Sequence, residues 1–481
     1  MVASVAPDLA EVAPLARTLT EQPVHQYSRV RKIAIVFMMS WVAFTTSFSS
    51  AALFPAISDI ASDFGTTRSV IDASNAAVFI CLAISGFLWV PLMQSLGRRY
   101  AYYAAVVIFF ILSIATAAAP TIKVWFAMRC VSMLEGTIFH IAGQALIADI
   151  FPPAKRGTAI GFFLVGTISG PALGPCIGGI TVTFADWRVI FWTQCGMMGF
   201  GALLCLLFYP SEIETVKAEP SLPGPFDVVR AFNVMHIFRL FKYPNVLLTN
   251  ITCGLLSFSQ YSLLIAPHHL INPRLNLTTP LVSGLFYLSP LAGFIVGTLL
   301  GGAYSDHIVV KYVRLRGRRA PQDRLRAGSW AFFAVIPVSS MVYGWCLQYS
   351  KGGLAVPIVA AFWWAAGLMA AFSGLNAYCV ESFPDRRTEV VAGKYFVQYA
   401  FGAGATGGMV PLIDRIGVGM ATTVGVGMVL VAGVMMSTTA DHGEGMQRWA
   451  DGLGKSGSQE QKVDHDRPPA AQRNDVHLED L

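Results

Sequence analysis

Residues 157–185 read GTAIGFFLVGTISGPALGPCIGGITVTFA and contain no Asp, Glu, Lys or Arg. A helix needs about 20 consecutive apolar residues to cross the hydrocarbon core of a bilayer, so this stretch is long enough to span a membrane. Other charge-free stretches of similar length cover residues 33–58, 73–96, 100–122, 189–211, 244–273, 275–305, 327–350, 352–380 and 416–440.

Two further stretches are long enough but carry charges. Residues 124–148 contain Arg129 and Glu135, and residues 390–413 contain Lys394. The whole chain is 54% hydrophobic and only 13% charged, a balance that excludes a water-soluble globular protein of this size. We therefore predict an all-α membrane protein with twelve transmembrane helices.

Basic residues are distributed unevenly between the loops. The two tails and the alternate loops on their side hold 26 of the 34 Lys and Arg residues, whereas each of the other six loops holds one. Since cytosolic loops carry an excess of Lys and Arg, we predict that both termini are cytosolic. The net charge of +6 then needs no nucleic-acid partner, because basic loops face an anionic leaflet.

The spans fall into two groups of six. We predict a cytosolic N-terminal tail (1–32), a six-helix bundle (33–209), a cytosolic linker (210–245), a second six-helix bundle (246–440) and a disordered cytosolic tail (441–481). Residues 226–241 of the linker alternate apolar and charged residues in a way that favours an amphipathic surface helix. In transporters built from such repeats, the substrate site lies near the midplane between the halves.

Small residues recur within the opening stretch. Their positions are Gly161, Gly170, Gly174, Pro175, Gly178 and Gly179. Glycines let two helices approach closely, and a proline bends a helix by removing a backbone donor. A general packing face is one interpretation. The spacing also resembles the antiporter motif of the major facilitator superfamily, which is characteristic of exporting members.

The loop after the second span resembles the cytosolic gating loop of the same superfamily. Its matching residues are Gly97, Arg98 and Arg99, while Gln94 stands where the family has Asp and Val90 where it has Gly. The second half repeats the pattern after the eighth span, with Gly302 and with the carboxylate present as Asp306. Ordinary basic loops would explain the positive charges but not the matched placement.

Three more segments, residues 148–157, 187–192 and 376–384, look like those of fungal drug:proton antiporter-1 type transporters. The resemblance covers residues 33–440, and the overall likeness is greatest to fungal organic-acid exporters such as those for itaconate and citrate. It implies a plasma-membrane antiporter with two six-helix bundles that moves a small substrate in exchange for protons. It implies no metal or other cofactor.

Charges at membrane depth cost about 2.5 to 3.5 kcal/mol each, so they normally face a cavity and act there. On a helical wheel Arg129 and His140 share one stripe, and Lys394 and Gln398 share a face. We predict that these four residues bind an anionic substrate, and that Glu135 and His140 carry protons. The alternatives are a structural Arg129–Glu135 ion pair and a His140 that only makes structural hydrogen bonds.

We predict export of a small organic acid, itaconate-like, by a monomer in the bilayer. Efflux of drugs or of a secreted glycolipid is the alternative within transporters, and a transporter-like nutrient sensor is an alternative of another class. An enzyme is not expected, because no nucleophile-and-base motif or nucleotide-binding loop is present. Asn276 begins an Asn-Leu-Thr glycosylation acceptor that we place on the outer face.

Overall fold

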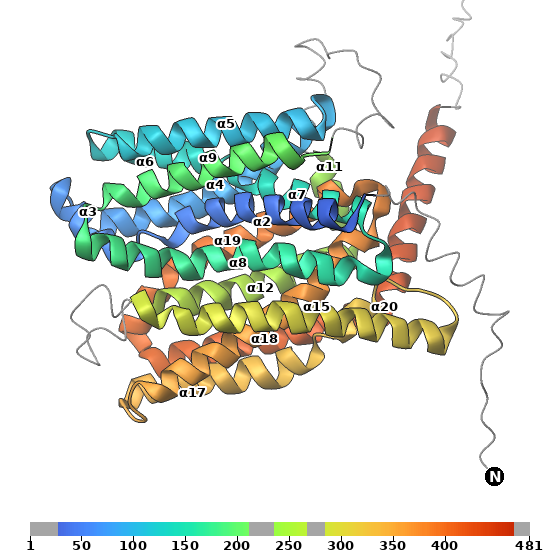
Figure 1. The fold of residues 1–481 in the computed structure, drawn as a ribbon. Helices are drawn as coiled ribbons and strands as arrows, with labels where there is room; N and C mark the ends of the chain where they lie inside the picture. Colours follow the sequence, from blue (N-terminus) through green and yellow to red (C-terminus); the bar gives the residue numbers. More distant parts are fainter. Residues whose placement is uncertain (1–26, 211–234, 267–283, 466–481) are drawn as a thin grey trace, which may run out of the picture.

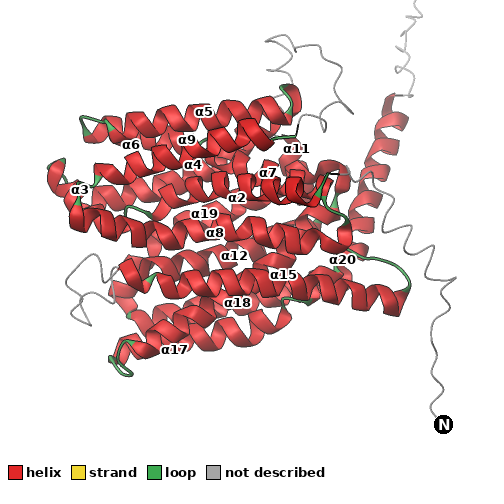
Figure 2. Ribbon diagram, viewed as in Figure 1, coloured by secondary structure: helices red, strands yellow, loops and turns green. Residues whose placement is uncertain are grey.

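The computed structural model describes residues 27–210, 235–266 and 284–465. These parts of the chain form helices that run side by side and are joined by short loops (Figure 1, Figure 2). A backbone amide or carbonyl in hydrocarbon has no water to bond, so helices that pair these groups internally are favoured. Asn276, the predicted glycosylation acceptor, lies outside the described residues.

The helices form two consecutive groups. The first comprises α2 (Arg29–Ala51), α3 (Ile57–Asp63), α4 (Arg68–Ser95), α5 (Arg98–Ala117), α6 (Ile122–Met133), α7 (Gly136–Ile150), α8 (Pro153–Phe184) and α9 (Arg188–Phe208). After α11 (Met235–Arg239), the second comprises α12 (Pro244–Ala266), α15 (Leu288–Arg316), α16 (Asp323–Arg326), α17 (Ile336–Tyr349), α18 (Ala355–Ser382), α19 (Arg387–Ile416) and α20 (Val418–His465).

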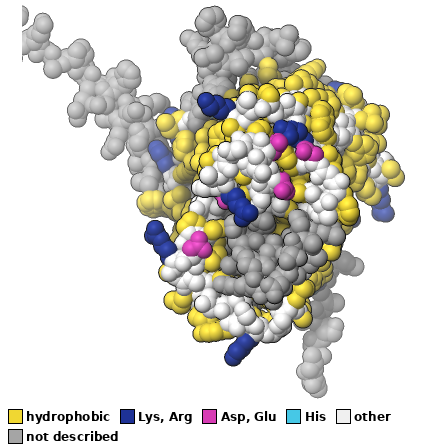
Figure 3. All heavy atoms as spheres, turned by 90° about the vertical axis from the view of Figure 1, so that its left-hand side faces the viewer, with side chains coloured by type: hydrophobic (Ala, Val, Ile, Leu, Met, Phe, Trp, Pro, Cys, Tyr) yellow, Lys and Arg dark blue, Asp and Glu magenta, His cyan; other side chains and the backbone are white. Residues whose placement is uncertain are grey.

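The predicted all-α membrane fold is confirmed. Within the described ranges, ten helical segments are long and apolar enough to cross a membrane, and α12 and α19 complete the predicted set of twelve spans. The end of the bundle near α3 shows charged side chains on its face, with hydrophobic side chains gathered around its rim (Figure 3). This distribution fits a protein whose sides contact lipid and whose ends contact water.

The C-terminal tail differs from the sequence prediction. Helix α20 continues to His465, so the disorder predicted from residue 441 is wrong over residues 441–465. The continuation is held by side chains of the second group. Arg326 pairs with Asp441 at 2.6 Å, Arg318 with Glu444 at 3.0 Å, and the Tyr243 hydroxyl donates to Asp451 at 2.9 Å. In Figure 1 this red end of α20 crosses the end of the bundle at a steep angle to the other helices.

The described end of the linker contacts both groups of helices. Helix α11 places the ring of Phe238 5.0 Å from that of Phe87 on α4 and 6.1 Å from that of Phe396 on α19. Ile237 beside it is buried. The end of the predicted amphipathic helix therefore packs on the junction between the two halves.

The two halves meet along two helix pairs, α8 with α15 and α4 with α19. Helix α8 also packs along α2, and here the glycines of the opening stretch face the neighbouring backbone. A Cβ atom on Gly170 would lie 2.6 Å from the Phe48 backbone nitrogen, and one on Gly174 would lie 2.9 Å from that of Ala52. Gly178 faces the Ala52 carbonyl even more closely. These three positions therefore require glycine for steric reasons.

We predict that Gly170→Ala lowers the thermal stability of the detergent-purified protein, because overpacking a close helix contact costs about 1 to 3 kcal/mol. Gly408→Ala on α19 is the matched control, since no heavy atom lies within 4 Å of the added Cβ atom there. The unfolding temperatures of both variants and the parent provide the measurement. Equal temperatures for all three would show that the α2–α8 contact tolerates the extra atom.

Candidate functional site

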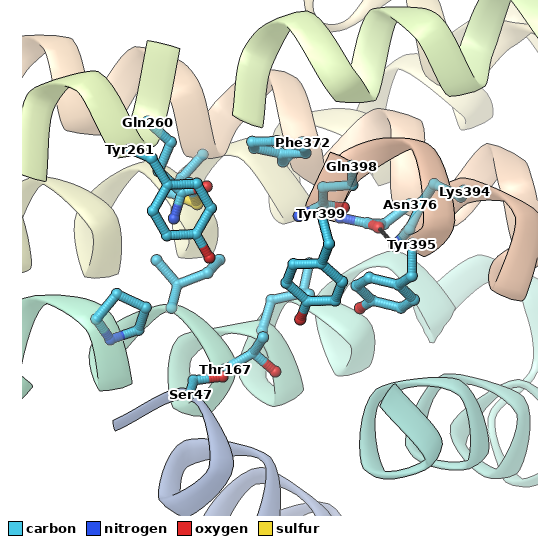
Figure 4. Close-up of a pocket in the computed structure, with 14 residues that line it drawn as sticks. Ser47, Thr167, Gln260, Tyr261, Phe372, Asn376, Lys394, Tyr395, Gln398 and Tyr399 are labelled. Carbon is cyan, nitrogen blue, oxygen red and sulfur yellow. Dashed lines mark hydrogen bonds between the residues drawn. The ribbon is translucent and has the colours of Figure 1, made fainter. Parts of the chain in front are cut away.

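A small cavity lies between the two halves (Figure 4). Its water-accessible volume is about 30 Å³, which gives room for only a few water molecules. The lining residues come from α2, α8, α12, α18 and α19. The polar and aromatic ones are Ser47, Thr167, Gln260, Tyr261, Phe372, Asn376, Lys394, Tyr395, Gln398 and Tyr399. In this arrangement of the halves, the cavity is therefore too small to hold more than a few water molecules.

Lys394 is the cation of this cavity. Its side chain is 1% exposed, and its Nζ donates to the Asn376 Oδ1 atom at 2.5 Å. The ammonium also lies 3.5 Å from the centre of the Tyr395 ring. No Asp or Glu belongs to the cavity lining within the described residues. The charge of Lys394 is therefore met by an amide oxygen and an aromatic face, and not by a carboxylate.

Neutral polar groups surround the lysine. The rings of Tyr395 and Tyr399 are stacked with their centres 5.6 Å apart, and the amide of Gln144 donates to the Tyr395 hydroxyl at 2.6 Å. Gln398 Oε1 and Thr167 Oγ1 are buried and have no hydrogen-bond partner among the described residues. The cavity can therefore offer a ligand one positive charge together with unused polar atoms.

His140 lies directly behind the cavity wall. Its Nε2 is 3.2 Å from the hydroxyl of Ser47, and its Nδ1 is 3.0 Å from the Gly136 carbonyl. Since a carbonyl only accepts, Nδ1 carries a proton, and a neutral ring would accept from Ser47 through Nε2. The ring centre is 5.3 Å from that of Tyr395. His140 is thus linked to the cavity through Ser47 but does not line it.

The fourth span is broken in the middle of the membrane, between α6 and α7. The backbone groups that the break releases find partners on α4, because Trp89 donates to the Leu134 carbonyl at 3.0 Å and Ser85 accepts from the Thr137 amide at 3.1 Å. Glu135 sits at the break and is 6% exposed. Its Oε2 has no hydrogen-bond partner in the described part of the chain. A buried carboxyl group is therefore held at a helix break.

Arg129 is fully buried but lies away from the cavity. Its Nη1 donates to the Ser74 hydroxyl at 3.2 Å, and its guanidinium lies 5.2 Å from the centre of the Trp125 ring. It does not line the cavity, and it forms no ion pair with Glu135 or with another described carboxylate. Of the predicted substrate-binding residues, the structure brings Lys394 and Gln398 into the cavity, places His140 behind its wall and leaves Arg129 apart.

Sequence reasoning missed Thr167, Tyr395 and Tyr399. Tyr395 and Tyr399 follow Lys394 and Gln398 by one residue each, so a wider arc on the helical wheel of α19 would have included them. Thr167 stands in the glycine-rich stretch, where its neighbours indicated only packing. Aromatic side chains in a span are most often packing residues, and only the cavity distinguishes these.

The predicted gating loops lie at the contact between the halves. Arg98 and Arg387, from opposite halves, both bind Asp149, at 2.8 and 2.7 Å. The Gln94 amide, at the position where the carboxylate was missing, donates to Glu389 of the other half at 3.4 Å. Gly97 has a φ of +84°, a conformation that favours glycine, and Arg99 stacks on Tyr103 beside it.

The second loop makes matching contacts with the start of α8. Asp306 accepts from the backbone amide of Thr158 at 3.0 Å and from its hydroxyl at 2.7 Å. A Cβ atom on Gly302 would lie 3.2 Å from the Gly157 carbonyl, so two glycines allow the helices to meet here. Arg324 joins Asp306 to Glu381, which is 3.7 Å from Arg156 of the first half. Polar contacts thus tie the halves together at this end.

Comparison with known proteins gives consistent results. The family model of the Major Facilitator Superfamily matches residues 39–407. The MFS-type transporter penM of Penicillium rubens is 26% identical over 80% of this chain and 78% of its own, and the efflux pump FUB11 of Gibberella moniliformis is 23% identical over 82% and 70%. The proton:xylose symporter XylE from E. coli superposes with a TM-score of 0.63 at 15% identity, covering 86% and 96%.

We predict that Asp149→Asn favours opening of the cavity at the end where Arg98 and Arg387 bind this carboxylate. The variant is combined with Thr167→Cys in a chain without its native cysteines. Loss of a partly buried ion pair worth about 1 kcal/mol should raise the labelling rate of the introduced thiol roughly fivefold, with an impermeant maleimide applied from that side.

Arg448→Gln serves as the control, because the Arg448–Glu444 pair is exposed and lies within one half. Its labelling rate should equal that of the parent. If Asp149→Asn also labels at the parental rate, the Asp149–Arg387 pair does not hold the halves together.

Proposed function

The chain belongs to the major facilitator superfamily, a family of membrane transporters, and we propose that it is a proton-coupled exporter of a small organic acid. Export would proceed by alternating access, with the cavity opening to one side of the membrane at a time. The observation that carries this proposal is the buried Lys394 in a cavity whose described lining residues include no carboxylate. The termini and the basic loops would face the cytosol of a cell whose plasma membrane holds the protein.

A carboxylate substrate would supply what Lys394 lacks. Burying an ammonium in a medium of low dielectric constant costs several kcal/mol unless an opposite charge and good hydrogen bonds compensate. An incoming carboxylate could accept from Nζ in place of Asn376 Oδ1, and a charge-assisted bond is about twice as strong as a neutral one. The tyrosine hydroxyls and the amide of Gln398 would bind the remaining oxygens. An itaconate-like acid has carboxylate oxygens that can accept these hydrogen bonds.

Substrate entry requires a wider cavity. A volume with room for only a few water molecules cannot admit an organic acid, so the contacts that hold the halves together must separate on one side. The polar contacts around Asp149 and Asp306, which join the two halves at one end, are the ones expected to open during loading. They would close again when the loaded carrier opens to the other side.

Glu135 is the stronger candidate for the proton carrier. Its Oε2 has no partner among the described residues, so the carboxyl group can gain a proton without losing a hydrogen bond there. Both ring nitrogens of His140 already have partners, which favours a positioning role through Ser47. Efflux of a larger apolar metabolite is the second candidate function. It is favoured by the tyrosine-rich lining and by the similarity to the efflux pump FUB11.

We predict that Lys394→Gln lowers carboxylate export by about tenfold or more, the effect of losing a hydrogen bond to a charged group. Lys311→Gln, which removes an exposed lysine, is the control. Efflux of labelled itaconate, labelled citrate and a neutral lipophile from cells provides the measurement. Export of the lipophile should be unchanged in both variants. If the parent moves only the lipophile, or if Lys394→Gln exports the acids normally, the apolar-efflux function replaces the organic-acid one.

We also predict that Glu135→Gln separates binding from coupling. In proteoliposomes, the variant should still exchange labelled for unlabelled substrate, because Glu135 does not line the cavity. It should lose accumulation driven by a proton gradient, since Gln cannot take up a proton. His140→Asn is the comparison and should retain gradient-driven accumulation. Coupling that survives Glu135→Gln and fails in His140→Asn would transfer the proton-carrying role to the histidine.

A further inference from the structure

The guanidinium of Arg129 is buried without a counter-charge. Arg129 is 1% exposed, and its one hydrogen bond goes to the neutral hydroxyl of Ser74. Its Nε and Nη2 atoms are buried and have no partner in the described part of the chain. A hydroxyl and an aromatic ring are weak compensation for a charge at membrane depth. Two nitrogen atoms of a fixed cation, which carry three N–H donors, therefore remain available to an acceptor.

Another unused donor belongs to a neighbouring residue. The indole Nε1 of Trp125, whose ring contacts the guanidinium, is buried and has no partner within the described residues. Of these residues only Ser74 also bears an acceptor oxygen, and the charge is wholly positive. The cluster formed by Arg129, Trp125 and Ser74 thus has the composition of an anion site.

This cluster lies at a different depth from the cavity. Arg129 precedes His140 by eleven residues of the fourth span, which corresponds to about 16 Å along a helix, toward the end of the span at Ile122. His140 is at the level of the cavity, since its ring contacts Tyr395. One ligand therefore cannot bind Arg129 and Lys394 together in this arrangement.

We propose that Arg129 and Trp125, with Ser74, form a second anion site that is separate from the cavity and takes a small monovalent anion. The anion is either chloride from solution or the carboxylate of the exported acid, and both offer a compact negative acceptor to the guanidinium fork. The carboxylate version rests on the proposed export function, whereas the chloride version does not. In both versions, Arg129 and Lys394 bind anions at two separate depths of the protein.

The test is thermal unfolding of the detergent-purified full chain at constant ionic strength, with sodium gluconate replaced stepwise by sodium chloride or by sodium acetate. A ligand that binds only the folded state raises the unfolding temperature, by roughly 1 to 2 °C for a chain of this length at ten times its dissociation constant. The parent should respond to one of these anions. Arg129→Gln should lose the chloride response and keep only the acetate response that Lys394 supplies, whereas Lys394→Gln, which removes the other buried cation, should keep the Arg129-dependent response.

Trp125→Phe provides a second variant that retains the ring and loses the donor. Its response should need a severalfold higher anion concentration, and this result stands even if Arg129→Gln fails to fold. A response to acetate alone identifies a carboxylate site, and a response to chloride at similar concentrations identifies a halide site. A parent that responds to neither anion, or an Arg129→Gln variant that responds as the parent does, overturns the proposal.

The same samples separate this proposal from the export function. If cells expressing the parent export no acid while the purified protein keeps its Arg129-dependent response, the organic-acid function fails and the second anion site stands. If acid export depends on Lys394 and no anion response depends on Arg129, the organic-acid function stands and the second anion site fails.

Discussion

The absence of water from the bilayer core is the constraint on which the rest of this structure depends. It requires each backbone amide to find its partner within the protein, and the described spans meet this requirement as helices. The fourth span is the informative exception. Its break between α6 and α7 survives because Trp89 and Ser85 of α4 bond the released backbone groups. Glu135 is buried inside the bundle at the same point. The irregular backbone and the buried ionisable group therefore occur together.

The same constraint determines where charge can be placed. Lys394 and Arg129 are both buried, yet neither has a described carboxylate as partner, whereas Asp149 pairs with Arg387 across the two halves and Asp306 accepts from the Thr158 hydroxyl of the other half. These contacts join the halves, and in the proposed function the two unpaired cations bind the ligands. A transporter needs both kinds, because the contacts that close the cavity must be reversible and the contacts inside it must depend on the substrate.

The spans could be predicted from sequence because a bilayer requires long stretches of apolar residues, and the length of each such stretch can be read directly from the sequence. The tail could not, because Asp441 and Glu444 are ordered by partners that lie over a hundred residues away. On α19, which is unbroken, helical spacing correctly grouped Lys394 with Gln398. On the fourth span the same reasoning grouped Arg129 with His140, but eleven residues of helical rise separate the two along the span.

The tail helix has a mechanical consequence. Asp441, Glu444 and Asp451 bind the second half or the adjoining end of the linker, so residues 441–465 move as an arm of that half. At 1.5 Å per residue the arm is about 37 Å long, and a rotation of about 10° would carry its far end through about 6 Å. Small tilts inside the membrane would then be amplified in the water outside it. A dye on this arm would report the rocking of the halves as a change in energy transfer.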